Sequence, residues 1–562
     1  MTSILTPSSA TDVDDGPAIA ELHRQHAVQR AAFLADPYPD AAVRKGHLGA
    51  LAGIVMAHRD EIRAAMSADF GVHPELFTDL VEVVGVAGRA AYAMEQVEAW
   101  MAEDERPAEP AFFGTARAGI RYQPKGVVGN IVPWNFPFDL SLGPLVEMLA
   151  AGNRVIIKPS DYTPACAALL RRMVSDTFPE DLVAVSVGGL TLAKEFPTLR
   201  WDHLLYTGSP AIGREVALAA ADHLVPVTLE LGGKCPAILA ADSIDAESVR
   251  SVIGTKLIKN GQMCISVDYA LVPRAQVEDF VAHAESYAAQ ELANYASSPD
   301  CTGIITQRHL ERIDAMIDEA KAAGARMVSL GGEGDRETRR LPLLLVVDPP
   351  KDLRIMHEEV FGPILPVIPY DDLGEALADI NAGERPLGLY VYSKDGEVAE
   401  SVLRRTTSGG ACINICALQG ALPSLGFGGI GQSGSGRHHG IEGFREFSNP
   451  RGVVVRGSGD LTDAFLPPYG PLAQAIVSFV FDSAAQAGAE APENVGARDA
   501  MPAGSLSRPR CHVASRASWE QQLEQVFDYT AWHQLVVKID RSADRRANLA
   551  GGEPACPLTG AG

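Results

Sequence analysis

The sequence predicts an α/β protein built on parallel sheets and organised in more than one domain. Short β-rich runs alternate with apolar helical stretches from about residue 126 onward, and strands arranged in this way pair in parallel. The 562 residues exceed what one hydrophobic core usually organises, so two or more domains are expected. With 46% hydrophobic and 21% charged residues, the composition is typical of a globular protein.

The first part of the chain shows helical periodicity almost throughout, from about Ile19 to Met101. Leu48, Leu51 and Ile54 follow the spacing of one buried helix face. An α-helical region is therefore expected before the first strand.

Four short β-rich runs follow this region, at residues 126–132, 154–158, 182–187 and 203–207. An apolar helical stretch at residues 140–150 separates the first run from the second. Strand, helix and strand in this order imply a parallel sheet, and the alternation continues through the remaining runs. We therefore expect a nucleotide-binding domain up to about residue 229.

The turn after the fourth run has features of a pyrophosphate site. Gly208 ends the strand, Ser209 stands where it can cap the following helix, and Pro210 suits the first helical turn. Exposed backbone amides at such a helix N-terminus bind phosphate groups. An ordinary βα turn is the alternative, because the segment up to Gly213 lacks the third glycine of the usual dinucleotide fingerprint.

Polar residues after the second run strengthen the nucleotide interpretation. Lys158 can bond ribose hydroxyls, Asp161 can accept a hydrogen bond from the adenosine 2′-hydroxyl, and Ser160 lies between them. A solvated surface lysine is the alternative for Lys158. Together the two segments predict cofactor-binding residues at Lys158, Ser160, Asp161, Gly208, Ser209 and Gly213.

Residues 245–349 form a second alternating series, which we expect to build a catalytic domain because Cys264 lies near its start. Further on, Glu359 can hold the ribose of a nicotinamide cofactor while Phe361 packs near the nicotinamide ring. The alternative is a loop in which Glu358 and Glu359 are a solvated acidic pair and Phe361 is a core residue.

Cys264 is the strongest candidate for a catalytic residue. A cysteine adds to a carbonyl carbon as its thiolate, and a free thiol with a pKa of about 8.5 needs surroundings that supply that form. Glu230, which two glycines follow, offers a base, and Asn135, between two prolines, offers an amide donor. Taken separately, Glu230 reads as a surface carboxylate and Asn135 as a turn residue.

Composition and termini argue against several other classes of protein. The net charge of -23 disfavours a nucleic-acid partner, because phosphate binding needs a basic surface. The eight cysteines are scattered without a disulfide framework or zinc-site spacing, which favours a reducing compartment. The chain begins without a secretory leader, and its apolar stretch at residues 472–481 falls far short of the roughly 20 residues that span a bilayer. We expect a cytoplasmic enzyme with no metal and no membrane partner.

Seven motifs, in order and over about 300 residues, resemble those of the aldehyde dehydrogenase superfamily, and the resemblance covers roughly residues 20–470. They contain Asn135, Lys158, Gly208, Glu230, Cys264, Glu359 and Phe427. Asp268 and Tyr269, together with the segments at residues 385–390 and 433–440, are similar to the class 3 branch, and most of all to coniferyl aldehyde dehydrogenases.

The resemblance implies N-terminal helices and a Rossmann-type NAD(P)-binding domain at residues 1–229, an α/β catalytic domain at residues 230–440 and an oligomerisation or closing segment at residues 441–470. It also implies a small β element for oligomerisation, built from segments near residues 118–124 and 452–456, and a homodimer. Residues 471–562 have no counterpart in the family.

The implied reaction converts a hydrophobic or aromatic aldehyde, coniferyl aldehyde among the candidates, to the carboxylic acid. Cys264 attacks the carbonyl carbon, and the Asn135 amide and the Cys264 backbone N–H hold the oxyanion. Hydride passes to the nicotinamide, and water activated by Glu230 hydrolyses the resulting thioester. NAD is the expected cofactor, with NADP an alternative, because the Asp161 carboxylate repels a 2′-phosphate.

The sequence departs from the family pattern at two positions. Gly426 stands where relatives usually have proline, and Gln419 stands where class 3 members often have histidine. Both are expected near the substrate entrance. His438 and His439 are assigned to a structural glycine-rich loop, because adjacent residues point in different directions and no third metal ligand is evident.

Two other functions remain open. A CoA-acylating relative would release the same thioester to CoA, but Glu230 in the position of a hydrolytic base argues against it. A binding or scaffold protein that retains the fold is the non-enzymatic alternative, and the intact Cys264, Glu230 and Asn135 argue against it.

The C-terminal tail combines a polar segment with a candidate helix. Residues 483–510 are rich in alanine, glycine, proline and serine and are expected to form a flexible linker. After it, Ser518 begins a capping-box pattern, and Trp519, Leu523 and Phe527 share one helical face. This helix docks on the core or on a partner, with disorder as the alternative.

Overall fold

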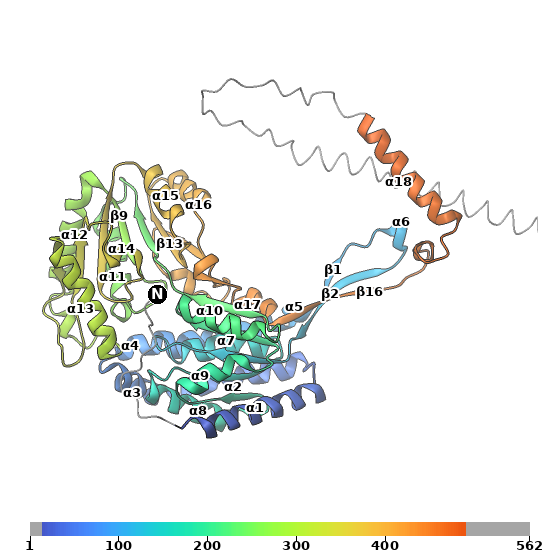
Figure 1. Cartoon of the computed structure of the whole chain (residues 1–562), viewed down its shortest axis with the longest axis horizontal. Helices are drawn as coiled ribbons and strands as arrows, with labels where there is room; N and C mark the ends of the chain where they lie inside the picture. The colour runs from blue at the N-terminus through green and yellow to red at the C-terminus, as the bar shows by residue number, and fades with distance from the viewer. Residues whose placement is uncertain (1–13, 490–562) are drawn as a thin grey trace, which may run out of the picture. The chain divides into compact units, whose positions relative to one another are not determined.

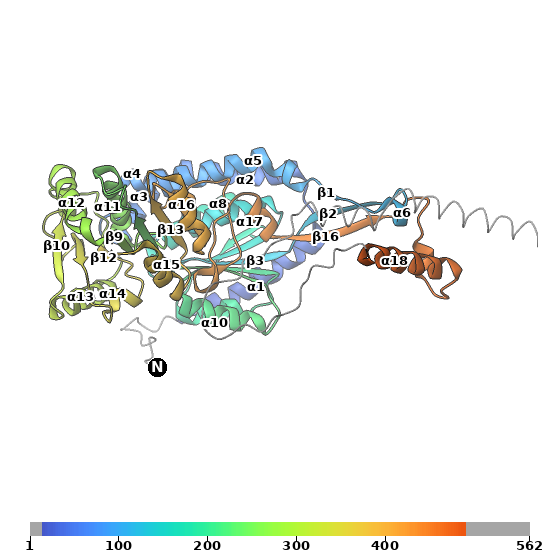
Figure 2. The same cartoon turned by 90° about the horizontal axis from the view of Figure 1, so that it is seen from above.

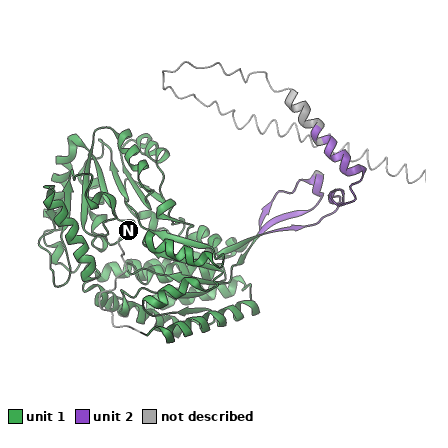
Figure 3. Ribbon diagram, viewed as in Figure 1, with its two compact units in different colours: residues 1–102, 121–451 green, residues 103–120, 452–562 purple. Residues whose placement is uncertain are grey.

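A computed structural model describes residues 14–489 of the chain. Figure 1 shows the course of the helices and strands. The chain divides into two compact units, which Figure 3 colours separately. Unit 1 comprises residues 1–102 and 121–451, and unit 2 comprises residues 103–120 and 452–562.

The predicted helical region at the start of the chain is confirmed. Its elements are α1 (Gly16–Ala35), α2 (Ala41–Ala57), α3 (Arg59–Phe70), α4 (Glu75–Thr78), the π-helix η1 (Asp79–Gly85) and α5 (Val86–Met101). The Asp40 side chain caps α2 by accepting a hydrogen bond from the Val43 N–H. Leu48, Leu51 and Ile54 of α2 are buried, as their spacing predicts.

A six-stranded sheet contains all four strands that the β-rich runs predict. Its order is β15 (Gly434–Ser435), β7 (Val227–Leu231), β6 (His203–Gly208), β3 (Val127–Ile131), β4 (Arg154–Lys158) and β5 (Val183–Val185). The strands run parallel except β15, which pairs antiparallel with β7. Helices α1 and α10 (Pro210–Ala221) contribute to the hydrophobic cluster on this sheet, while α7 (Asp139–Ala150) and α8 (Pro164–Thr177) contact β4 and β5.

A seven-stranded sheet forms the second part of unit 1. Its order is β10 (Arg326–Leu330), β11 (Leu343–Val347), β12 (Ile364–Tyr370), β9 (Tyr269–Pro273), β8 (Pro236–Leu239), β13 (Gly388–Tyr392) and β14 (Gly410–Ile413). Only β10 is antiparallel to its neighbour.

Both faces of the seven-stranded sheet are covered, as is usual for parallel strands (Figure 2). Ala237 and Leu239 pack with α11 (Ala246–Leu257) and α12 (Val277–Glu291), whereas Ile238 between them packs with α15 (Leu373–Ala382) and α16 (Gly396–Arg405). This alternation follows from the two-residue period of a strand.

The chain changes from the first sheet to the second between Leu231 and Pro236. It returns to the first sheet through β15, after the second sheet is complete. The compact units follow a different division from the domain boundaries that the sequence predicts, which remain predictions.

A three-stranded sheet has the order β1 (Asp104–Arg106), β2 (Arg117–Pro124) and β16 (Ser448–Val455). The two segments expected to form the small β element are thus neighbouring strands, although they lie more than 300 residues apart in the sequence. Its role in oligomerisation remains a prediction.

Unit 2 also contains α6 (Pro110–Phe113), the 3-10 helix η8 (Thr462–Phe465) and α18 (Pro471–Ala489). Because α18 extends to Ala489, the flexible linker predicted at residues 483–510 is wrong for residues 483–489. The remainder of that linker and the helix predicted after Ser518 lie outside the described residues. Within residues 14–489, no helix is long and apolar enough to cross a membrane.

Candidate active site

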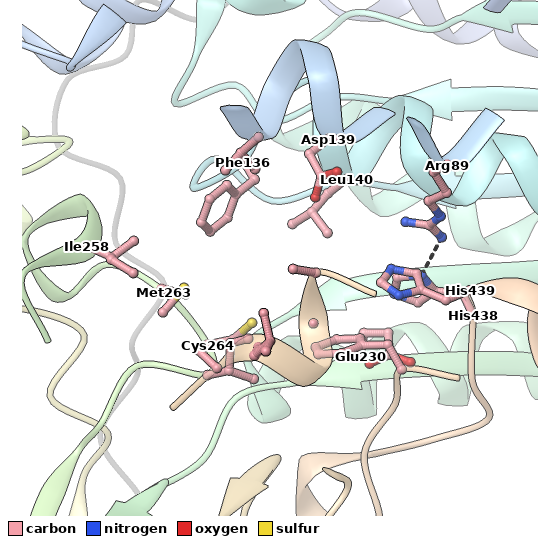
Figure 4. Close-up of a pocket in the computed structure, with 18 of the residues that line it drawn as sticks. Arg89, Phe136, Asp139, Leu140, Glu230, Ile258, Met263, Cys264, His438 and His439 are labelled. Carbon is pink, nitrogen blue, oxygen red and sulfur yellow. Dashed lines mark hydrogen bonds between the residues drawn. The ribbon is translucent and has the colours of Figure 1, made fainter. Parts of the chain in front are cut away.

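A cavity of about 530 Å³ lies in unit 1, and most of its wall is apolar (Figure 4). Its apolar side chains include Phe77, Val81, Phe136, Leu140, Met263 and Phe427. Its polar side chains include Arg89, Asp139, Thr207, Glu230, His438 and His439, and Cys264 also faces it. A mostly apolar pocket with a few polar groups suits a hydrophobic small molecule.

The main chain turns sharply before Cys264, in the 3-10 helix η3 (Ile258–Gly261) that follows α11. Three consecutive residues have a left-handed backbone, with φ of 50° at Lys259, 54° at Asn260 and 79° at Gly261. Such values are strained for residues other than glycine. At Gly261, an added Cβ would lie 2.2 Å from the carbonyl oxygen of Gly362, so glycine is required there.

The surroundings of the Cys264 thiol favour its protonated form. Burial is the main cause that raises its pKa, to about 12, and the carboxyl groups of Glu359 and Glu230 act in the same direction. The backbone N–H groups of Ile265 and Cys264 oppose the shift. Nucleophilic attack therefore requires a proton acceptor in the cavity.

Glu230 of β7 is buried, with 2% of its surface exposed, so the interpretation as a surface carboxylate is wrong. Neither of its carboxyl oxygens has a hydrogen-bond partner. Burial raises the pKa of Glu230 well above its usual value, although Arg437 acts in the opposite direction. A buried carboxyl group with unmet hydrogen bonds lines the same cavity as Cys264 and can exchange a proton there.

Asn135 lies in the loop between β3 and α7 and is buried. Its side-chain Nδ2 donates a hydrogen bond of 3.3 Å to the carbonyl oxygen of Gln262, two residues before Cys264. The amide is therefore attached to the loop that carries the thiol. Cys264 and Glu230 thus line one cavity, whereas Asn135 does not line it but is bound to the loop before Cys264. The catalytic roles of the three residues remain predictions.

Among the predicted cofactor residues after β4, Lys158 is a buried cation and Asp161 is an exposed acid. Lys158 is 2% exposed, so the surface-lysine alternative is wrong. Its Nζ donates a hydrogen bond of 2.9 Å to the Pro159 carbonyl and lies 3.8 Å from Asp161 Oδ1. The Ser160 hydroxyl accepts a hydrogen bond from the Tyr162 N–H. Asp161 is exposed.

The turn from Gly208 to Gly213 connects β6 to α10. Ser209 stands at the N-cap position and Pro210 in the first turn, but the prediction that the Ser209 side chain caps the helix is wrong, since it makes no capping bond. The backbone N–H groups there thus lack a side-chain partner. The hydroxyl of Thr207, two residues before Ser209, is also buried without a partner, and Thr207 lines the same cavity as Cys264. Gly213 packs closely, with an added Cβ 2.8 Å from Leu231.

Glu358 and Glu359 differ in environment, so the alternative of a solvated acidic pair is wrong. Glu358 forms an exposed ion pair of 2.9 Å with Arg354. The Glu359 carboxyl group instead lies against Gly232, where an added Cβ would come within 2.1 Å of it. Burial raises the pKa of Glu359 to about 8.

Phe361 has a left-handed backbone, with φ of 46°, and its ring makes an edge contact with Trp134 at 5.3 Å between centroids. It is partly exposed rather than a core residue. The Glu359 carboxyl group thus lies close to Gly232, and the Phe361 ring lies close to Trp134.

Sequence reasoning missed a polar cluster in the cavity wall. His438 and His439, which were assigned to a structural loop, line the cavity with Arg89 of α5 (Figure 4). Arg89 donates to Glu147 at 3.0 and 2.6 Å and to His438 Nδ1 at 2.8 Å. Because a guanidinium only donates, His438 is neutral and carries its proton on Nε2. Its pKa is well below the usual value through burial, with a smaller contribution from Arg89.

The two departures from the family pattern have different surroundings. The Gln419 side chain is buried, where Oε1 accepts a bond of 2.8 Å from Cys412 Sγ, and it does not line the cavity. Its neighbours Leu418 and Gly420 do line the cavity, so Gln419 lies beside the cavity, and its place near the substrate entrance remains a prediction. Gly426 precedes the cavity-lining Phe427, and an added Cβ there would lie 2.8 Å from Glu442.

Among residues 14–489, no group of three His, Cys, Asp or Glu side chains is placed to hold a metal ion. Cys235 is buried, and its Sγ accepts a hydrogen bond of 3.2 Å from the Gly388 N–H. Burial raises its pKa well above the usual value.

The family model of the aldehyde dehydrogenase family matches residues 2–453. The chain belongs to the aldehyde dehydrogenase family. It is 40% identical over 450 residues to a probable coniferyl aldehyde dehydrogenase of Caulobacter vibrioides, covering 79% of this chain and 93% of that protein. A second probable coniferyl aldehyde dehydrogenase, from Pseudomonas aeruginosa, is 41% identical over 463 residues, covering 82% and 97%. The mouse aldehyde dehydrogenase family 3 member B2 is 33% identical over 472 residues, covering 83% and 96%.

Solved aldehyde dehydrogenases share the fold. The substrate-bound AldH of Staphylococcus aureus superimposes with a TM-score of 0.76 at 30% identity, covering 82% of this chain and 99% of that one. An aldehyde dehydrogenase of Mycobacterium tuberculosis complexed with NAD+ gives 0.70 at 27% identity, covering 78% and 90%. This chain is therefore an oxidoreductase of the aldehyde dehydrogenase family.

Proposed function

We propose that this aldehyde dehydrogenase converts an aromatic, largely apolar aldehyde to its carboxylic acid through a thioester on Cys264. The observation that carries the proposal is the placement of Cys264 and Glu230 on one mostly apolar cavity. The attachment of the Asn135 amide to the Cys264 loop supports it.

The steps follow from the groups around the cavity. The Cys264 thiol loses its proton to a water molecule in the cavity, and its sulfur forms a bond to the aldehyde carbon while the carbonyl π bond opens to leave an oxyanion. The Asn135 amide and the Cys264 backbone N–H donate hydrogen bonds to the oxyanion. A bound NAD supplies the acceptor for the hydride that leaves this carbon.

Hydrolysis then releases the acid. Glu230 takes a proton from water, the oxygen attacks the thioester carbon, and the bond from carbon to sulfur breaks. The proton returns to the sulfur, so Cys264 is ready for another turnover. Hydrolysis of the thioester needs a base in the cavity, and the buried Glu230 carboxyl group can act as that base. Transfer of the acyl group to CoA does not require such a base.

The cavity wall supports an aromatic substrate. Phe77, Phe136 and Phe427 line it, and aromatic rings favour edge and offset contacts with one another. Two of the most similar relatives bear the name coniferyl aldehyde dehydrogenase. We therefore propose an arylpropenal such as coniferyl aldehyde.

NAD is the proposed cofactor. Lys158 and Glu359 would hold its two riboses, the N-terminus of α10 would bind its pyrophosphate, and Phe361 would pack near the nicotinamide ring. The exposed carboxylate of Asp161 would repel the 2′-phosphate of NADP.

The test is the variant Cys264→Ala, compared with Cys166→Ala as a matched control. Cys166 is buried and does not line the cavity. We expect Cys264→Ala to lose NADH formation with coniferyl aldehyde while it still binds NAD, and Cys166→Ala to keep both. Turnover retained by Cys264→Ala would refute the proposed nucleophile, and acyl-CoA formed in an assay with CoA would refute hydrolysis.

A further inference from the structure

Lys259 and Glu82 form a buried ion pair that the proposed reaction does not use. Their side chains are 0% and 1% exposed, and Nζ lies 3.7 Å from Glu82 Oε1. Lys259 holds this place with a left-handed backbone, at φ of 50°. Removing two charges from water lowers the stability of the fold, and so does the strained backbone of Lys259. We therefore expect the pair to have a function.

Glu82 attaches the π-helix η1 to the start of α7. Its Oε2 accepts hydrogen bonds from the N–H of Phe138, at 3.0 Å, and of Asp139, at 2.7 Å. These residues follow Asn135 closely in the sequence. The carboxylate therefore fixes the end of the loop that carries the amide.

Lys259, the cation of the ion pair, holds the same loop at a second point. Its ammonium group donates to the main-chain carbonyl of Asn135, and it lies 4.5 Å from the Phe70 ring centroid and 4.4 Å from that of Phe136. The two aromatic rings stabilise the cation within an apolar surrounding. The position of Nζ is thus determined by several partners at once.

The network closes on the nucleophile loop. The Asn135 side chain donates to the carbonyl of Gln262, and Gln262 Nε2 donates in turn to the carbonyl of Lys259 at 3.0 Å. Asn135 is held at its main-chain oxygen by Lys259 and at its side chain by the loop before Cys264. A shift of Lys259 would therefore move the amide relative to the thiol.

We propose that Lys259 and Glu82 are positioning residues for the oxyanion-binding amide of Asn135. The proposal rests on the role of Asn135 in the proposed function. An oxyanion donor acts only within a short range of distance and angle, and a displacement of 1 Å can cost about 100-fold in rate. The buried pair holds this donor rigidly. Apolar packing alone has no preferred direction and would not fix the position of one carbonyl oxygen.

The experiment measures three quantities in Lys259→Met and Glu82→Gln. They are the rate of the first turnover of NADH formation, the rate of Cys264 alkylation by iodoacetamide, and the melting temperature. We expect the first-turnover rate to fall about 10- to 100-fold, while alkylation stays within twofold of wild type because the thiol is unchanged. A role in stability alone would lower the melting temperature and leave the first-turnover rate of the folded enzyme unchanged.

Combination with Asn135→Ala tests whether Lys259 acts through the amide. We expect Lys259→Met to add no further loss in that background, because the donor that it positions is absent. If Lys259→Met does not yield folded protein, Glu82→Gln serves for the same comparison. Arg44→Met is the matched control, since Arg44 is an equally buried cation that bonds the Pro39 and Ala150 carbonyls instead. It should lower stability and keep the first-turnover rate.

Two results would overturn the inference while leaving the role of Asn135 intact. One is a first-turnover rate within twofold of wild type in both single variants, and the other is a loss that multiplies with that of Asn135→Ala. If Asn135→Ala itself leaves the first turnover unchanged, the proposed role of Asn135 fails, and the positioning role fails with it. Retained turnover in Cys264→Ala would instead refute the proposed nucleophile independently of Lys259.

Discussion

At the scale of single residues, the acidic groups around Cys264 share one property, which is a raised pKa. Burial is the main cause for Glu230, for Glu359 at about 8 and for the Cys264 thiol at about 12. Burial favours the neutral form of each group, because a charge loses its hydration in an apolar surrounding. The resting cavity can therefore admit an apolar aldehyde, and charge develops when a proton moves.

The pH dependence of Glu230→Gln tests this arrangement. A general base works in its deprotonated form, so a raised pKa means that thioester hydrolysis accelerates as pH rises through that raised value. In Glu230→Gln we expect hydrolysis to fall about 100- to 10,000-fold and to lose this rise. Intact mass spectrometry at fixed times should then detect the acyl-enzyme.

The first turnover provides the control for this variant. Cys264 still titrates in Glu230→Gln, so NADH formation in the first turnover should retain its increase with pH. Wild-type rates of thioester hydrolysis in the variant would show that another group activates the water.

At the scale of elements, periodicity predicted the strands and helices well because burial repeats along them. The four runs from residue 126 to residue 207 are strands of one sheet, and residues 140–150 lie in α7. The ordered motifs also predicted that Asn135 and Cys264 come together. The sequence alone could not show that Asn135 would be attached through Gln262, since that contact depends on the tertiary fold.

The polar cluster and the ion pair were missed for the same physical reason. Arg89 lies on the buried side of α5, but its partners Glu147 and His438 are remote in the sequence. Lys259 and Glu82 are likewise joined only by folding. A charged residue within an apolar helical pattern was the available signal at Arg89, and it identifies no partner.

The turn before Cys264 gives a prediction at this scale. Gly261→Ala meets both the left-handed backbone and the Gly362 carbonyl, whereas Gly324→Ala meets only the backbone, because no atom lies within 4 Å of its Cβ position. Gly324→Ala should lower the free energy of unfolding by about 1 to 2 kcal/mol and leave turnover unchanged. Gly261→Ala should lower it further and reduce turnover more than about tenfold, because the loop must move.

Chemical denaturation and steady-state turnover of both glycine variants check this expectation. Equal losses of stability in the two variants, with equal turnover, would show that the close approach of Gly261 to Gly362 has no consequence.

At the scale of the whole molecule, the described structure leaves an edge strand for assembly. In the three-stranded sheet, β16 pairs with β2 on one side only. Its Val454 side chain is 70% exposed, and an apolar residue on an open strand edge is a feature that proteins usually avoid or cover. We therefore expect the homodimer that the family resemblance implies, with β16 in the contact.

Val454→Lys tests the dimer, because a charge on a strand edge opposes pairing with a second edge. We expect sedimentation velocity to give a dimer for the wild-type protein and a shift toward the monomer for Val454→Lys. Leu34→Lys on α1 is the matched control, since Leu34 is an equally exposed apolar residue, at 71%, on a different element. It should remain dimeric. A monomeric wild-type protein would contradict this expectation, because there would be no dimer interface to contain β16. The same loss of dimer in both variants would also contradict it, because the loss would then come from the added charge alone.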